Sequence, residues 1–166
     1  MQKTLVLIKP DGTGKNLIGE IIKRYEDAGL KVAELKMLTA PMSIIEKHYP
    51  MEREYLESIG NKTIAAGQKV KSAYDQGKKV VSWLRQFITS GPIVAMVLRG
   101  EDAVARVRKI TGFTDPAQAE KGTIRAELGT DSILKANAEE RPVYNLIHAS
   151  GSIDEAEKEI NLWFGN

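Results

Sequence analysis

The chain has 166 residues, 24 of them basic and 22 acidic, and it contains no cysteine. This length supports one sizeable core, so we expect a single domain that spans residues 1–166. The near balance of charge argues against a nucleic-acid or membrane partner, and any anion site must be local. The lack of cysteine excludes disulfides and thiolate metal sites, and two histidines do not favour a zinc centre. These features fit a cytoplasmic protein.

The first element is a short β-rich run, TLVLIK at 4–9, that ends at the turn-forming residues PDG. It predicts a buried strand. The run is too short for a signal peptide, and no later stretch approaches membrane-spanning length. Apolar residues then recur at helical spacing over 16–28, so we expect an amphipathic helix there that stops at Gly29.

The middle of the chain contains two further predicted strands. LKVAELKMLTA at 30–40 alternates as a half-buried strand does, and PIVAMVLRG at 92–100 is more continuously apolar. Between them, 43–90 mixes helix formers with glycines and predicts several short helices and loops. Another apolar stripe at helical spacing predicts a helix over 103–110.

The last third begins with a loop-like segment, after which TIRAEL at 123–128 suggests a helical turn. Residues 129–142 look irregular, and VYNLIHA at 143–149 predicts a fourth strand. The order of elements matches a ferredoxin-like α+β sandwich with a four-stranded antiparallel sheet. Such a fold hosts many unrelated functions, so the function must be argued from the site.

DGTGKN, which follows the first strand, resembles a phosphate-binding loop but lacks two of its residues. That loop needs a glycine five residues before the Gly-Lys pair and a Ser or Thr after it, whereas Lys9 and Asn16 occupy these places. A dinucleotide GxGxxG motif is also excluded, because residue 17 is leucine.

His148 ends the last predicted strand, just before a helix whose capping box is Ser152 and Glu155. The predicted buried stripe of this helix consists of Ile153, Ala156, Ile160 and Trp163. The positive helix N-terminus disfavours imidazolium and keeps the ring neutral and nucleophilic. Glu159 lies one turn beyond Glu155 and is free to bond the ring and fix its tautomer. Taken alone, a core histidine bonded to a carbonyl is the more frequent arrangement.

Six short motifs occur in one order over nearly the whole chain: KPDG after the first strand, HY at 48–49, SGP at 90–92, T-G-x-T-x-P at 111–116, GTIR at 122–125, and NLIHAS before the capped helix. In order and approximate spacing they resemble the nucleoside diphosphate kinase family. The resemblance implies a ping-pong exchange, in which a nucleoside triphosphate donates its terminal phosphoryl group to His148 and a nucleoside diphosphate then collects it.

The resemblance also implies roles for residues elsewhere in the chain. Lys9 meets the transferred group and the sugar hydroxyl, Tyr49 stands close to it, Arg108, Thr114 and Arg125 hold the outer phosphates, Asn145 bonds the sugar, and Glu159 with Ser150 orients the ring. Mg²⁺ is expected to be held mainly by the nucleotide phosphates. These cations suit a loose phosphoryl-transfer transition state, although single lysines and arginines are usually solvated surface charges.

The sequence also departs from the family pattern. After the histidine the family usually shows Gly-Ser-Asp-Ser, whereas this chain has Ala-Ser-Gly-Ser, so Gly151 replaces an aspartate that contributes to metal placement. Val80 aligns with the family's base-stacking phenylalanine. Against the family pattern we expect expansions near 51–82 and 129–142, which are either solvated helices or a lid over the nucleotide.

The alternative function is a nucleotide- or metabolite-binding ferredoxin-like module without phosphotransfer, which includes a degenerate kinase homologue. RNA-binding versions of the fold present aromatic side chains on their central strands, and TLVLIK and IVAMVLRG have none. The family forms symmetric oligomers, so the expected protein partner is a second copy of the chain, in a hexamer or a tetramer.

Overall fold

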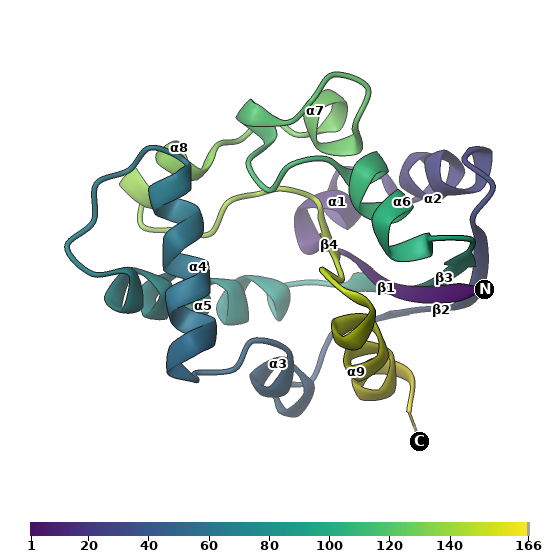
Figure 1. Cartoon of the computed structure of the whole chain (residues 1–166), viewed down its shortest axis with the longest axis horizontal. Coiled ribbons are helices and arrows are strands. Elements are labelled where there is room, and N and C mark those ends of the chain that lie inside the picture. Colours follow the sequence, from purple (N-terminus) through teal and green to yellow (C-terminus); the bar gives the residue numbers. More distant parts are fainter. Residues whose placement is uncertain (166) are drawn as a thin grey trace.

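The computed structural model describes residues 1–165 and contains a four-stranded sheet with helices on both faces (Figure 1). The strands are β1 (Gln2–Ile8), β2 (Lys31–Leu38), β3 (Ile93–Gly100) and β4 (Ile147–Ala149), and their order in the sheet is β2-β3-β1-β4. Every pairing is antiparallel. The predicted ferredoxin-like α+β sandwich is therefore confirmed.

The helices form the connections between the strands. Their bounds are α1 (Pro10–Gly14), α2 (Ile18–Asp27), α3 (Met42–His48), α4 (Arg53–Ala65), α5 (Ala73–Ile88), α6 (Ala103–Thr111), α7 (Ile124–Leu128), α8 (Ile133–Ala138) and α9 (Ile153–Phe164), with a 3-10 turn, η1, at Pro116–Gln118. Within residues 1–165, no helix has both the length and the apolar character needed to cross a bilayer.

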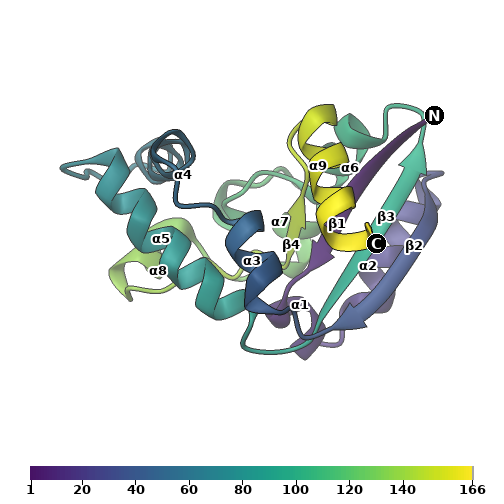
Figure 2. The same cartoon turned by 90° about the horizontal axis from the view of Figure 1, so that it is seen from below.

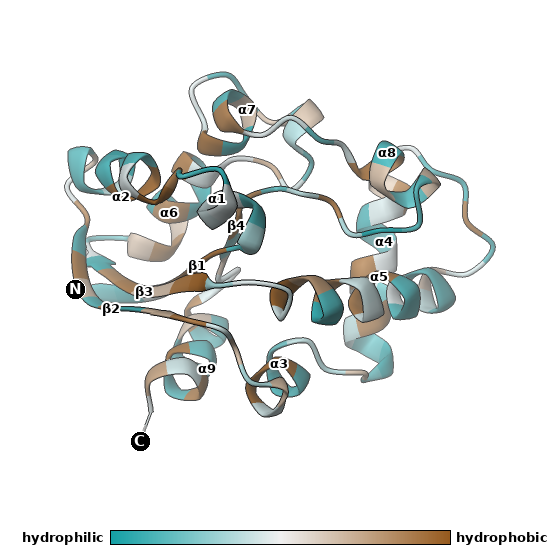
Figure 3. Ribbon diagram, turned by 180° about the vertical axis from the view of Figure 1, so that it is seen from behind, coloured by the Kyte–Doolittle hydropathy of each residue, from teal (hydrophilic) through white to brown (hydrophobic). Residues whose placement is uncertain are grey.

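β1 is apolar on both of its faces because helices cover both sides of the sheet. Val6 and Ile8 pack in one core layer with residues of α2 and α6. Leu5 and Leu7 pack in the other layer, which includes Trp163 of α9 and residues of α3 and α5. Figure 2 shows α3 and α9 in front of the sheet and α2 behind it, and Figure 3 shows the hydrophobic residues of β1 and β3 between the layers.

Helices α4 and α5 project beyond the sheet and cross in close contact (Figure 1). A Cβ on Gly60 would lie 1.9 Å from the carbonyl oxygen of Ala73, and one on Gly77 would lie 1.8 Å from that of Leu56. Only glycine allows the two backbones to approach this closely. The crossing fixes the position of α4, which forms one wall of the cavity described below.

The fourth strand is shorter than the predicted 143–149, because β4 begins at Ile147. Leu146 has a φ of +69°, a left-handed conformation that interrupts extended pairing. Its N–H donates to Oδ2 of Asp11 at 2.9 Å, and its carbonyl accepts the N–H of Lys9 at 2.8 Å. The residues before β4 are therefore bonded to the start of α1 and do not extend the ladder.

Three other details of the sequence prediction were wrong. PDG forms the start of α1, with Pro10 at a first-turn position that needs no backbone N–H. The segment predicted as irregular contains α8, whose first turn is capped by Ser132. Ile153 is 49% exposed, because α9 begins at the surface, where 151–154 are all exposed.

Candidate active site

His148 lies on β4 and faces a cavity of about 530 Å³. Its Nε2 lies 2.7 Å from Oε1 of Glu159, and the Ser150 hydroxyl donates to Oε2 of the same carboxylate at 2.5 Å. Because an ionised carboxylate only accepts hydrogen bonds, the proton is assigned to Nε2 and the lone pair to Nδ1. The ring is therefore held in one tautomer, with Nδ1 free.

Burial, together with the positive charge of Lys9, lowers the pKa of His148 to about 3. The ring is thus neutral at neutral pH, as the sequence suggested, but burial and not the N-terminus of α9 is the main cause. Burial also raises the pKa of Glu159. The His148 side chain is 18% exposed, so it remains open to the cavity.

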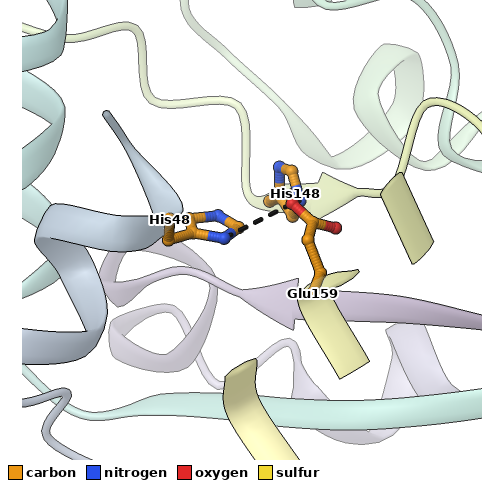
Figure 4. A group of neighbouring side chains, drawn as sticks. All are labelled: His48, His148 and Glu159. Carbon is orange, nitrogen blue, oxygen red and sulfur yellow. Dashed lines mark hydrogen bonds and ion pairs between the residues drawn. The ribbon is translucent and has the colours of Figure 1, made fainter. Parts of the chain in front are cut away.

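His48, at the end of α3, is a second buried imidazole beside the first, as Figure 4 shows. Its ring centroid lies 4.5 Å from that of His148, with the planes at 83°. Its Nδ1 accepts the indole N–H of Trp163 at 3.3 Å and lies 3.3 Å from Oε1 of Glu159. Sequence reasoning assigned His48 no role, although the HY motif at 48–49 was a signal for it.

His48, His148 and Glu159 offer three ligand atoms within 4.8 Å of one another. Each residue already has a hydrogen-bonding neighbour: Trp163 for His48, and Glu159 and His148 for each other. These contacts hold the His148 ring, and we assign no metal to the cluster.

We expect neither imidazole to titrate between pH 5 and 8, because burial lowers the pKa of both His48 and His148 to about 3. The chain has only two histidines, so imidazole NMR signals followed against pH give a direct test. An unfolded histidine titrates near 6.5, so between pH 6.5 and 3 the unfolded chain binds more protons. The free energy of unfolding should therefore fall as the pH falls through this window. A ring that titrates near 6.5 in the folded protein contradicts this expectation.

Lys9 follows β1 directly and is buried. Its ammonium donates to Oδ1 of Asn145 at 2.8 Å, and Nδ2 of Asn145 donates to the carbonyl of Thr114 at 2.8 Å. Burial, together with the positive charge of Arg125, lowers the pKa of Lys9 to about 8. No carboxylate within residues 1–165 forms an ion pair with Lys9, so its charge is available to an anion in the cavity.

Arg125, in α7, is buried, and its guanidinium donates to three backbone carbonyls. The acceptors are Asn145 at 3.1 Å, Gly112 at 3.0 Å and Ile147 at 2.5 Å. A guanidinium has five N–H donors, so two remain for a ligand. Burial lowers its pKa to about 10. Arg125 thus ties the loops around β4 together and also lines the cavity.

Seven of the nine sequence-predicted site residues line this one cavity: Lys9, Tyr49, Arg108, Thr114, Arg125, Asn145 and His148. Glu159 and Ser150 do not line it and lie behind the ring of His148, in contact with each other. The structure thus brings together residues from both ends of the chain. Sequence reasoning missed Lys62 and Glu155, which also line the cavity, and Asp11, which holds Leu146.

The far wall of the cavity is largely apolar. It is formed by residues of α4, α5 and the α8 region, among them Ile59, Val80, Leu84, Ile133, Ala136 and Val143. The cavity therefore combines cations beside His148 with an apolar cluster on the helical wall, where Asn61, Lys62, Asn137 and Arg141 also line it. A ligand with a polyanionic part and a flat apolar part matches this division.

A neutral imidazole with a free nitrogen can attack phosphorus, and nearby cations can stabilise the charge on the transferred group. The fold and the site together define a phosphotransferase. The sequence profile of the family described as nucleoside diphosphate kinase matches residues 2–166. The chain belongs to the nucleoside diphosphate kinase family, which confirms the resemblance seen in its motifs.

Individual relatives agree with this assignment. The chain is 44% identical to a nucleoside diphosphate kinase of Pyrobaculum aerophilum, over 99% of this chain and 95% of the relative. A crystal structure of an NDP kinase from the same organism superposes with a TM-score of 0.92 at 42% identity, covering 98% of this chain and 95% of that one. A transition-state mimic of the Borrelia burgdorferi enzyme, with bound vanadate and ADP, gives a TM-score of 0.81 at 33% identity, with coverages of 98% and 86%.

Proposed function

We propose that this enzyme transfers the terminal phosphoryl group of a nucleoside triphosphate to a nucleoside diphosphate through a phosphohistidine on His148. The observation that supports the proposal is the arrangement of the ring, with Nε2 held by Glu159 and Nδ1 free beside a cationic cavity. In the first half-reaction the Nδ1 lone pair bonds to the terminal phosphorus, and the bond from phosphorus to the diphosphate oxygen breaks. In the second, a different diphosphate reverses these changes.

Phosphorylation at Nδ1 places positive charge on the ring, and Nε2 keeps its proton throughout. The Glu159 carboxylate, fixed by Ser150, stabilises that charge and keeps the ring aimed at the cavity. Lys9, Arg108 and Arg125 neutralise the transferred group and the outer phosphates. Within this proposal, Tyr49 packs beside the reacting group, Thr114 faces the phosphates, and Asn145 bonds the sugar.

The apolar residues of the cavity wall are compatible with binding of nucleotides that carry different bases. Val80, Leu84 and Ile133 offer a base van der Waals contact and no donors or acceptors that distinguish one ring system from another. Affinity then comes mainly from the phosphates and the sugar, which all nucleotides share.

Mg²⁺ is the expected cofactor, and the residues present fit it. Mg²⁺ in nucleotide sites is usually held by one or two carboxylates together with substrate phosphates. Glu155 is the one carboxylate of residues 1–165 that lines the cavity. This donor set suits an ion bound mainly through the nucleotide, and when bound it would neutralise phosphate charge.

Labelling with γ-³²P-ATP and Mg²⁺ tests the function. The wild type is expected to acquire a label that is stable in base and labile in acid, as a phosphoramidate is, and to lose it when a nucleoside diphosphate is added. An unlabelled protein that still binds ADP would instead support the alternative, a nucleotide-binding module without phosphotransfer.

We also propose that the chain forms a homo-oligomer, either a hexamer or a tetramer. Within residues 1–165, β2 pairs with β3 alone, so its other edge is open. This strand exposes Leu35 by 48% and Met37 by 57%, and an apolar edge strand favours pairing with another chain.

Light scattering is expected to give a mass several times the 18.3 kDa of one chain. The double substitution Leu35→Lys and Met37→Lys should lower that mass, because like charges would meet across the paired edges. A wild-type protein with the mass of a single chain would refute the proposal.

A further inference from the structure

Gly151 stands where the family usually has an aspartate, and the structure shows what occupies the space. A Cβ on Gly151 would lie 2.6 Å from Oε2 of Glu155 and 3.6 Å from Nη1 of Arg108. The carboxylate of Glu155 therefore lies where a side chain at 151 would begin. A side chain at 151 would displace the end of the Glu155 side chain, so the present position of this carboxylate depends on glycine at 151.

The carboxylate is held in this place by the backbone. Gly151 N–H donates to Oε2 of Glu155 at 2.9 Å, and Glu155 N–H in turn donates to the hydroxyl of Ser152 at 3.1 Å. The sequence had suggested a standard capping box, in which the glutamate bonds the N–H of the capping residue itself. Here it bonds the N–H of the preceding residue, which brings the carboxylate toward His148 and the cavity.

The surroundings of Glu155 are cationic. Arg108 and Lys62 line the same cavity, and Lys62, in α4, forms no ion pair within residues 1–165. Lys62 is exposed, yet partial desolvation lowers the pKa of its ammonium; the charge of Glu155 opposes this shift, and the charge of Arg108 adds to it. Glu155 is thus the carboxylate around which these cations are arranged, although its own side chain is bonded only to the backbone.

We propose that Glu155 supplies, from one helical turn further along the chain, the carboxylate that an aspartate at 151 supplies in relatives, and that it positions the metal–nucleotide complex in the cavity. The inference rests on the proposed function. Glu155 acts here as a positioning residue: its carboxylate, which lines the cavity with Arg108 and Lys62, would help to hold the cation that the phosphates bind. Because the Glu155 side chain extends from α9 to the backbone of Gly151, its carboxylate takes the place of the side chain that Gly151 lacks.

The test measures metal binding directly, by titrating Mn²⁺ into the protein in the presence of ADP and following free Mn²⁺ by electron paramagnetic resonance. Glu155→Gln keeps an oxygen that can accept the Gly151 N–H but removes the charge, so it should weaken Mn²⁺ binding about tenfold. The Mg²⁺ concentration for half-maximal rate should rise by a similar factor. Asp154→Asn, at an exposed acidic neighbour outside the cavity, is the matched control and should change neither value.

A second set of variants moves the carboxylate from position 155 to position 151. Glu155→Ser alone should bind Mn²⁺–ADP poorly, because it removes the carboxylate that lies beside Gly151. Gly151→Asp combined with Glu155→Ser returns the carboxylate to the family position and should restore wild-type Mn²⁺ affinity. Circular dichroism of each variant reports whether it is folded.

The outcomes separate this inference from the function itself. If the wild type forms phosphohistidine but Glu155→Gln binds Mn²⁺–ADP as tightly as the wild type does, Glu155 has no positioning role and the function stands. If Asp154→Asn weakens Mn²⁺ binding as much as Glu155→Gln does, the effect is general electrostatics and the proposal is wrong. If the wild type is never labelled, the proposed function fails whatever Glu155 does.

Discussion

Replacing His148 by alanine should lower phosphoryl transfer by at least about four orders of magnitude, because in the proposed mechanism the phosphoryl group is carried between substrates on this imidazole. His48 cannot substitute for it. Its side chain is fully buried, and its Nδ1 already accepts the indole N–H of Trp163. The loss of activity should be equally large in steady-state phosphoryl exchange and in the amount of acid-labile ³²P on the protein.

The same variant should keep its affinity for ADP within a few fold, since Lys9, Arg108 and Arg125 remain in place. Calorimetric titration with ADP is the control that separates lost chemistry from lost binding. Undiminished labelling of His148→Ala would show that another residue is the nucleophile.

The second large effect is expected at Lys9. Lys9→Ala should lower kcat/KM by about 10²- to 10³-fold, because the buried ammonium beside Asn145 is a preorganised cation in a partly desolvated site. Stopped-flow measurement of phosphoenzyme formation would report this loss without contributions from product release.

The pH dependence gives Lys9 a distinct signature. Burial lowers its pKa to about 8, so the free enzyme loses this positive charge as the pH rises through 8. The kcat/KM profile of the wild type should therefore decline above about pH 8, since it reports the free enzyme. Lys9→Arg should keep its charge and shift the decline to higher pH. If the alkaline limb is the same in both proteins, Lys9 is not the group that causes it.

Several features of the fold were readable because they are local in the chain. β1 and β3 are continuous apolar runs between turn formers, and they were placed within two residues of their observed bounds. The start of α9 was readable from Ser152, whose hydroxyl accepts the Glu155 N–H as a capping residue does. The candidate site residues were found through six short motifs, because the motifs and their order can be read from a single sequence.

Other features were not readable because they depend on contacts between distant residues. β4 is short because Leu146 is held in a left-handed conformation by Asp11, 135 residues away in the chain. The packing of His48 against His148 and Glu159 joins α3 to β4 and α9, and no local pattern predicts it.

The sequence by itself determined the class of fold, the nucleophile candidate and the cations around it, because periodicity, caps and ordered motifs are written along the chain. Only the tertiary structure decided that burial, more than the helix dipole, keeps His148 neutral, and that Glu155 fills the space beside Gly151. Desolvation and close approach are properties of residues brought together in space, and folding creates them.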